Sequence, residues 1–186
     1  MLKRRIIFSL VFIFFALYSI FFKGSKIYFL LFGLWPFVFY INKIIKISFP
    51  LPFEVISIIF IFLALGLGSE LRYYDIYPWY DLFLHIIAGG IFAFGSIYYL
   101  YNMEITNKMK YVLVVLISMG CASLWELYEY GSDTFFGMNT QRVEEGLYDT
   151  MNDITVHALG TVIVVGIYFV DNKFNDSNVV EKLCDK

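Results

Sequence analysis

Residues 81–101 read DLFLHIIAGGIFAFGSIYYLY, and this stretch decides the fold class. A helix needs roughly 20 mainly apolar residues to cross a bilayer, and the stretch meets that length. Its ionisable side chains are Asp81 and His85, which stand four positions apart near its start. The stretch is therefore expected to be a membrane-spanning helix with one polar face at its beginning.

Five further stretches have the same apolar character, so the sequence predicts six membrane spans. The predicted spans cover residues 6–22, 27–41, 53–68, 81–101, 111–130 and 150–170. The composition agrees, because 60% of the residues are hydrophobic and only 16% are charged, whereas soluble domains have about 25% charged residues. We expect an all-α, polytopic integral membrane bundle over residues 1–171, followed by a polar cytoplasmic tail at 172–186.

The orientation follows from the lysines and arginines, which favour cytoplasmic loops. With a cytoplasmic N-terminus, ten of the 14 basic residues lie inside. Six spans then place both termini in the cytoplasm, and the segments 69–80 and 131–149 become outer loops. We expect a multi-pass protein of the bacterial cytoplasmic membrane, in contact with membrane lipids. The net charge of −2 argues against a nucleic-acid partner.

The ionisable residues of the last three predicted spans all fall at the same end of the bundle. They are five carboxylates and both histidines of the chain: Asp81, His85, Glu126, Glu129, Asp149, Asp153 and His157. Their spacings of three or four positions put each set on one helix face. Since ionisable groups inside a membrane are costly and usually functional, we expect one shared polar site within residues 80–165, in the outer half of the bilayer.

Carboxylates packed this closely repel one another unless protons or a cation neutralise them. Imidazole nitrogen with carboxylate oxygen suits divalent metals such as Zn²⁺, Mn²⁺ or Fe²⁺, and Mg²⁺ is a further candidate for a carboxylate-rich site. All seven residues are candidate ligands, and Glu126 and Asp153 are the candidate catalytic groups. A bound ion would activate a water for hydrolysis or transfer on a lipid or cell-envelope precursor.

Two other functions stay open. An ion-binding or transport protein would use the same residues, although the inner half of the predicted bundle has no acidic chain to continue a path. A non-catalytic accessory protein would use the polar network only to fix the helices against one another. The loop 131–149 is long for a structureless connector, and Asn139 and Gln141 are its candidate contacts to a substrate or to the site.

Several of these residues form a pattern found in a known family. The chain has Asp81-x-x-x-His85, Trp125-Glu126-x-x-Glu129, Asn139-x-Gln141 and Asp149-Thr150-x-x-Asp153, with glycines at 89 and 160. This pattern resembles the YjdF-type family of small bacterial inner-membrane proteins, and more weakly the VanZ-like proteins. The resemblance implies a bacterial membrane protein and points to the same polar residues, but it implies no particular reaction.

Overall fold

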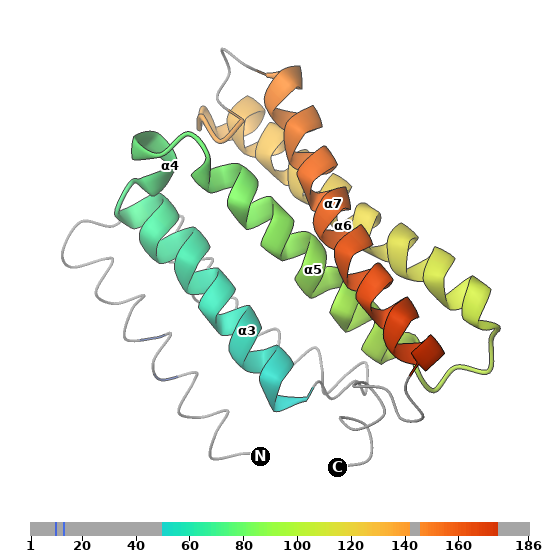
Figure 1. Cartoon of the computed structure of the whole chain (residues 1–186). Coiled ribbons are helices and arrows are strands. Elements are labelled where there is room, and N and C mark those ends of the chain that lie inside the picture. The colour runs from blue at the N-terminus through green and yellow to red at the C-terminus, as the bar shows by residue number, and fades with distance from the viewer. Residues whose placement is uncertain (1–9, 11–12, 14–49, 142–145, 175–186) are drawn as a thin grey trace. The chain divides into compact units, whose positions relative to one another are not determined.

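A computed structural model describes residues 10, 13, 50–141 and 146–174 of the chain. Its elements in order are α3 (Leu51–Ile61), a π-helix η1 (Phe62–Glu70), α4 (Tyr73–Ile76), α5 (Tyr80–Leu100), α6 (Asn107–Phe136) and α7 (Leu147–Phe174). All of these elements belong to one unit of the chain, Phe49–Lys186 (Figure 1). The predicted spans at 6–22 and 27–41 lie outside the described residues, apart from Leu10 and Ile13.

The helical fold class and the last four predicted spans are confirmed. The described part contains no strand, and four of its helices are long and apolar enough to cross a membrane. These helices are Leu51–Ser69, Tyr80–Leu100, Asn107–Phe136 and Leu147–Phe174. Helix α7 also takes in residues 172–174, which the sequence analysis assigned to the tail.

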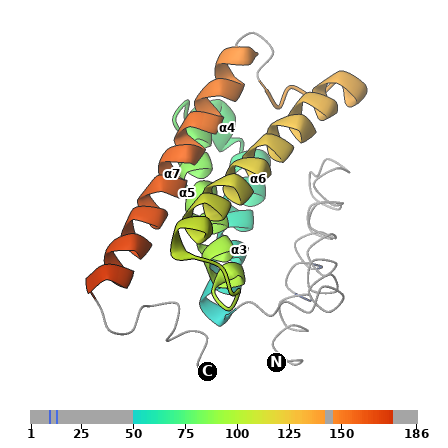
Figure 2. The same ribbon diagram turned by 90° about the vertical axis from the view of Figure 1, so that its right-hand side faces the viewer.

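Helices α5, α6 and α7 pack together in alternating directions, so that the start of α5, the end of α6 and the start of α7 lie at one end (Figures 1 and 2). At the other end the packing is apolar, around Ala93, Ile97, Val114 and Tyr168. The three-helix unit is therefore apolar at one end and carries its buried charges at the other.

Two glycines allow α5 and α7 to come unusually close. A Cβ atom at Gly89 would lie 2.1 Å from the backbone oxygen of His157, and one at Gly160 would lie 2.0 Å from the backbone oxygen of Ile86. Small residues at such crossings are the usual way in which membrane helices reach close contact. The two glycines of the sequence pattern therefore lie at the contact between the fourth and sixth predicted spans.

The third span does not end as a regular helix. In η1 the amide of Leu71 donates to the oxygen of Gly66, 3.1 Å away, so the helix is wider there by one residue per turn. The carbonyl of Leu63 in this segment accepts a hydrogen bond of 2.9 Å from the hydroxyl of Tyr80. Because Tyr80 is the first residue of α5, the π-helix is tied directly to the helix that carries Asp81 and His85.

The prediction that residues 131–149 form a loop is wrong in its bounds. Helix α6 continues to Phe136, and α7 begins at Leu147, so Asp149 lies in the first turn of a helix. Within this stretch the Ser132 hydroxyl finds its partner inside the helix, donating to the oxygen of Tyr128 at 2.8 Å. Helix α6 then ends at Gly137, whose φ of +63° is the left-handed conformation typical of a glycine that terminates a helix.

Candidate functional site

The site is built from the first turns of α5, the last turns of α6 and the first turns of α7. Each contributing residue is at least nine-tenths buried, although all of them are ionisable. They are Asp81 and His85 on α5, Glu126 and Glu129 on α6, and Asp149, Asp153 and His157 on α7. The predicted convergence in depth follows from the alternating helix directions, which bring these three helix ends together.

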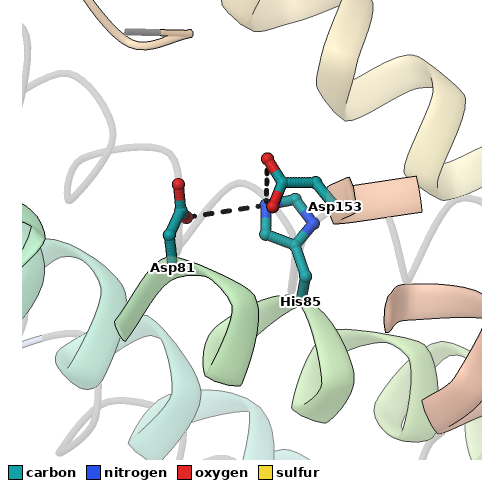
Figure 3. A group of neighbouring side chains, drawn as sticks. All are labelled: Asp81, His85 and Asp153. Atoms are coloured by element: carbon teal, nitrogen blue, oxygen red, sulfur yellow. Dashed lines mark ion pairs between the residues drawn. The ribbon is translucent and has the colours of Figure 1, made fainter. Parts of the chain in front are cut away.

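His85 lies between two aspartates from different helices (Figure 3). Its Nε2 atom is 3.7 Å from Oδ1 of Asp81 and 3.8 Å from Oδ2 of Asp153. Both separations exceed hydrogen-bond length, so a small cation would fit between the three groups. This set of Asp81, His85 and Asp153, called here the histidine group, has ligand atoms that all lie within 4.8 Å of one another.

A second group shares Asp153 with the first. Ligand atoms of Glu126, Glu129 and Asp153 also lie within 4.8 Å of one another, and we call this set the glutamate group. The indole Nε1 of Trp125 donates a hydrogen bond of 2.9 Å to Oε1 of Glu129 and so fixes the orientation of that carboxyl group.

Glu126 is one of the buried carboxyl groups of the site. Its side chain is only 6% exposed, and neither carboxyl oxygen has a hydrogen-bond partner among the described residues. A buried carboxyl group without such a partner is costly. A bound cation or a proton would therefore stabilise the Glu126 carboxyl group.

Two of the seven predicted ligands lie outside both groups. Asp149 is buried one helical turn before Asp153, and His157 is buried one turn after it. The Nε2 atom of His157 is 3.1 Å from the backbone oxygen of Ser118 and 3.1 Å from its hydroxyl. The structure thus brings together five of the seven residues and places His157 in contact with the backbone and side chain of α6.

His157, Ser118 and Thr161 form a buried polar node beneath the charged groups. The hydroxyls of Ser118 and Thr161 are 2.8 Å apart, and that of Thr161 donates to the oxygen of His157 at 3.0 Å. Both hydroxyls also lie 3.4 Å from the oxygen of Gly89 on α5. The node therefore joins all three helices and holds the charged groups above it in register.

The segment after α6 folds back onto that helix. The carboxylate of Asp133 accepts hydrogen bonds from the backbone amides of Thr140 and Gln141, at 2.7 and 2.9 Å. The side chain of Gln141 donates to the hydroxyl of Thr150 on α7, at 2.9 Å, whereas Asn139 is exposed. Gln141 thus links the connector to the helix that carries Asp153, while its predicted contact with a substrate stays a prediction.

The donor set and spacing of the histidine group fit a divalent metal. Zn²⁺ binds imidazole nitrogen and carboxylate oxygen at about 2.0–2.2 Å, so neighbouring ligands of a tetrahedral ion are roughly 3.3–3.6 Å apart. The 3.7 and 3.8 Å separations around His85 are only slightly wider. Three protein ligands with one open position are also typical of catalytic rather than structural zinc sites.

The comparison with known families agrees with this architecture. The family described as "Predicted membrane protein (DUF2238)" matches residues 4–173, nearly the whole chain. The chain belongs to this family. The YjdF-type family suggested by the sequence pattern is the same one. No curated protein and no solved structure matches the chain.

Membership in the DUF2238 family and the long apolar helices establish a multi-pass membrane protein. The family description carries no activity, so the chemistry of this DUF2238 protein has to be argued from its own side chains.

Sequence reasoning missed some of the side chains that contact the site. The i, i+4 spacing of Trp125 to Glu129 was the available signal for their hydrogen bond. Ser118 carried no signal, because its partners on α5 and α7 are distant in sequence.

Proposed function

We propose that the protein binds a divalent cation at the histidine group and uses it for hydrolysis or transfer on an ester of a lipid or cell-envelope precursor. Asp81, His85 and Asp153 hold the ion, and Glu126 acts as the acid–base group. Asp149 and Glu129 complete the negative surroundings. The site faces the outer side of the cytoplasmic membrane, in the orientation that the basic residues predict.

The observation that carries this proposal is the sharing of Asp153. One buried carboxylate, 1% exposed, supplies a ligand atom to a histidine group on one side and to a glutamate group on the other. The side next to His85 suits a metal, and the side next to Glu126 offers a buried carboxyl group that can accept a proton. A metal ligand beside a proton acceptor is what metal-assisted hydrolysis requires.

A divalent ion held by Asp81, His85 and Asp153 would activate a water as the nucleophile. In the proposed reaction the oxygen of the water bonds to the ester carbon or phosphorus while its proton passes to Glu126. The bond to the leaving alcohol oxygen then breaks, that oxygen keeps the electron pair, and Glu126 returns the proton to it. No oxidant or further reactant is needed, and transfer differs only in that a second alcohol replaces the water.

The proposal is tested by the effect of chelation on thermal stability. A cation that binds only the folded protein adds RT ln(1 + [L]/Kd), about 2.7 kcal/mol at a hundredfold excess over Kd. EDTA should therefore lower the thermal midpoint of the wild-type protein, and Zn²⁺ or Mn²⁺ should restore it. The Asp81→Asn and Asp153→Asn variants each remove a ligand of the ion and should lose this sensitivity.

Glu54→Gln is the matched control, because Glu54 is a buried carboxyl group on α3, outside both groups. This variant should keep the EDTA sensitivity whatever its own stability. A protonated polar network without metal predicts the opposite pattern. In that case EDTA would have no effect on the wild type, and the neutral substitutions would stabilise it.

A further inference from the structure

A largely apolar cavity opens beside the charged groups. Its volume is about 350 Å³, within the range of roughly 300–1,000 Å³ that small-molecule sites occupy. Most of its wall comes from apolar side chains of α3, η1, α5 and α6, including Phe60, Ala64, Leu84, Ala88, Phe92 and Ala122. Ionisable groups also line it: Asp81, His85, Glu129 and His157. The cavity therefore combines a hydrocarbon-like wall with members of both metal-binding groups.

We propose that this cavity binds the hydrocarbon chain of a lipid that carries a phosphate-ester headgroup. The inference rests on the proposed cation site and names the substrate class that the site takes. The apolar side chains that make up most of the wall favour a hydrocarbon, and the ionisable side chains favour a polar group at one end of the ligand. An amphiphile satisfies both parts of the wall.

The headgroup assignment follows from charge. Asp81 and Glu129 would repel a phosphate that approached the wall directly. A divalent cation held by Asp81, His85 and Asp153 reverses the local sign and offers a phosphate oxygen its open coordination position. Binding of the lipid should therefore require the cation. A neutral or cationic amphiphile would not show this requirement.

The size of the cavity suits one chain of moderate length. At roughly 30 Å³ for each water-sized group, 350 Å³ holds about a dozen such groups. Three of the lining residues lie on the outer surface of α6: Leu124, Trp125 and Tyr128 are 68%, 42% and 38% exposed. This surface belongs to a membrane-spanning helix, so the lipid would enter sideways from the bilayer.

Cys121 provides a reporter inside the cavity. It is a free thiol, partly buried, and it lines the cavity next to Ala122. In a Cys184→Ser background it is the only cysteine of the chain. The test measures the rate at which N-ethylmaleimide modifies Cys121 in the full-length protein, held in amphipol so that no detergent competes.

Dodecyl phosphate with Mn²⁺ should slow the modification, by roughly tenfold at ten times its Kd if only the empty cavity reacts. Inorganic phosphate with Mn²⁺, dodecanol with Mn²⁺, and dodecyl phosphate with EDTA should each leave the rate unchanged. Ala122→Phe fills the cavity and should abolish the protection. Gly120→Phe is its control, because a Cβ at Gly120 meets nothing within 4 Å, and it should keep the protection.

The thermal midpoint gives a second measurement that does not depend on thiol reactivity. Dodecyl phosphate should raise it only in the presence of Mn²⁺. If EDTA destabilises the protein but dodecyl phosphate neither protects Cys121 nor raises the midpoint, the lipid inference is wrong and the cation proposal stands. Protection by inorganic phosphate, by dodecanol or in EDTA would overturn the assignment of a phosphate-headed lipid. Insensitivity to EDTA and to added metal would instead remove the cation proposal itself.

Discussion

The contact of α5 with α7 makes Gly89→Ala the sharpest structural test of the fold. The added Cβ would lie 2.1 Å from the oxygen of His157, while ordinary contact begins at 3.4 Å, so the helices must separate locally by about 1.3 Å. Overpacking of this kind typically costs about 1–3 kcal/mol, and a gap of 0.5–1 Å forfeits a quarter to a half of each dispersion contact along the seam. We expect Gly89→Ala to destabilise the protein by about 1–3 kcal/mol.

The same separation would be forced by Gly160→Ala, whose Cβ meets the oxygen of Ile86 at 2.0 Å. Once one substitution has moved the helices apart, the second costs little more, so the double variant should be less destabilised than the sum of the two. Gly120→Ala and Gly166→Ala are the controls, because neither Cβ meets an atom within 4 Å. They should be neutral or gain up to about 1 kcal/mol from helix propensity.

The assay is thermal unfolding of the purified variants in one detergent, where each kcal/mol shifts the midpoint by about 2–4 °C for a chain of this size. Gly89→Ala should also weaken the EDTA effect, because Asp153 and His85 lie on opposite sides of the widened seam. If Gly89→Ala were as stable as Gly120→Ala, the close approach of α5 and α7 would be refuted.

Three further predictions concern the surroundings of the site. Ser118→Ala should cost about 0.5–1.5 kcal/mol in thermal unfolding because it breaks the buried node, whereas Ser123→Ala, whose hydroxyl bonds only within its own helix on an exposed face, should cost almost nothing. Trp125→Phe keeps an aromatic side chain but removes the indole donor that orients Glu129 beside Asp153, and it should weaken metal binding in a titration by about tenfold; unchanged affinity would mean that this bond does not support the position of the ligand Asp153. Asn139→Cys should react with an impermeant maleimide added outside whole cells and Asn107→Cys should not, and the reverse pattern would invert the proposed topology.

Much of this architecture could be predicted from the sequence because membrane spans are long and apolar. The convergence of Asp81, Glu126 and Asp153 followed from helix direction alone, since alternating helices return equivalent ends to one side. The end of α6 was misplaced because the apolar run is interrupted by the polar residues Ser132, Asp133 and Thr134, although Gly137 carried the correct stop signal.

The role of His157 depended on information that the sequence does not contain. Periodicity places His157 on the same face as Asp153, but the rotation of α7 against α6 decides what its ring meets. That rotation is set by the glycine seam, which brings His157 onto Ser118, 39 positions away in sequence. The π-helix was likewise hidden, because an i→i+5 turn leaves no periodic signature in a mainly apolar segment of nine residues.

The most direct test of the cation site is the metal content of the purified protein, measured by elemental analysis after equilibration with Zn²⁺ or Mn²⁺ and removal of free ions. The shared position of Asp153 predicts at least one bound ion per chain in the wild type and in Glu54→Gln, and almost none in Asp153→Asn. If the wild-type protein retained no ion, or if Asp153→Asn retained as much as the wild type, the central claim would be contradicted.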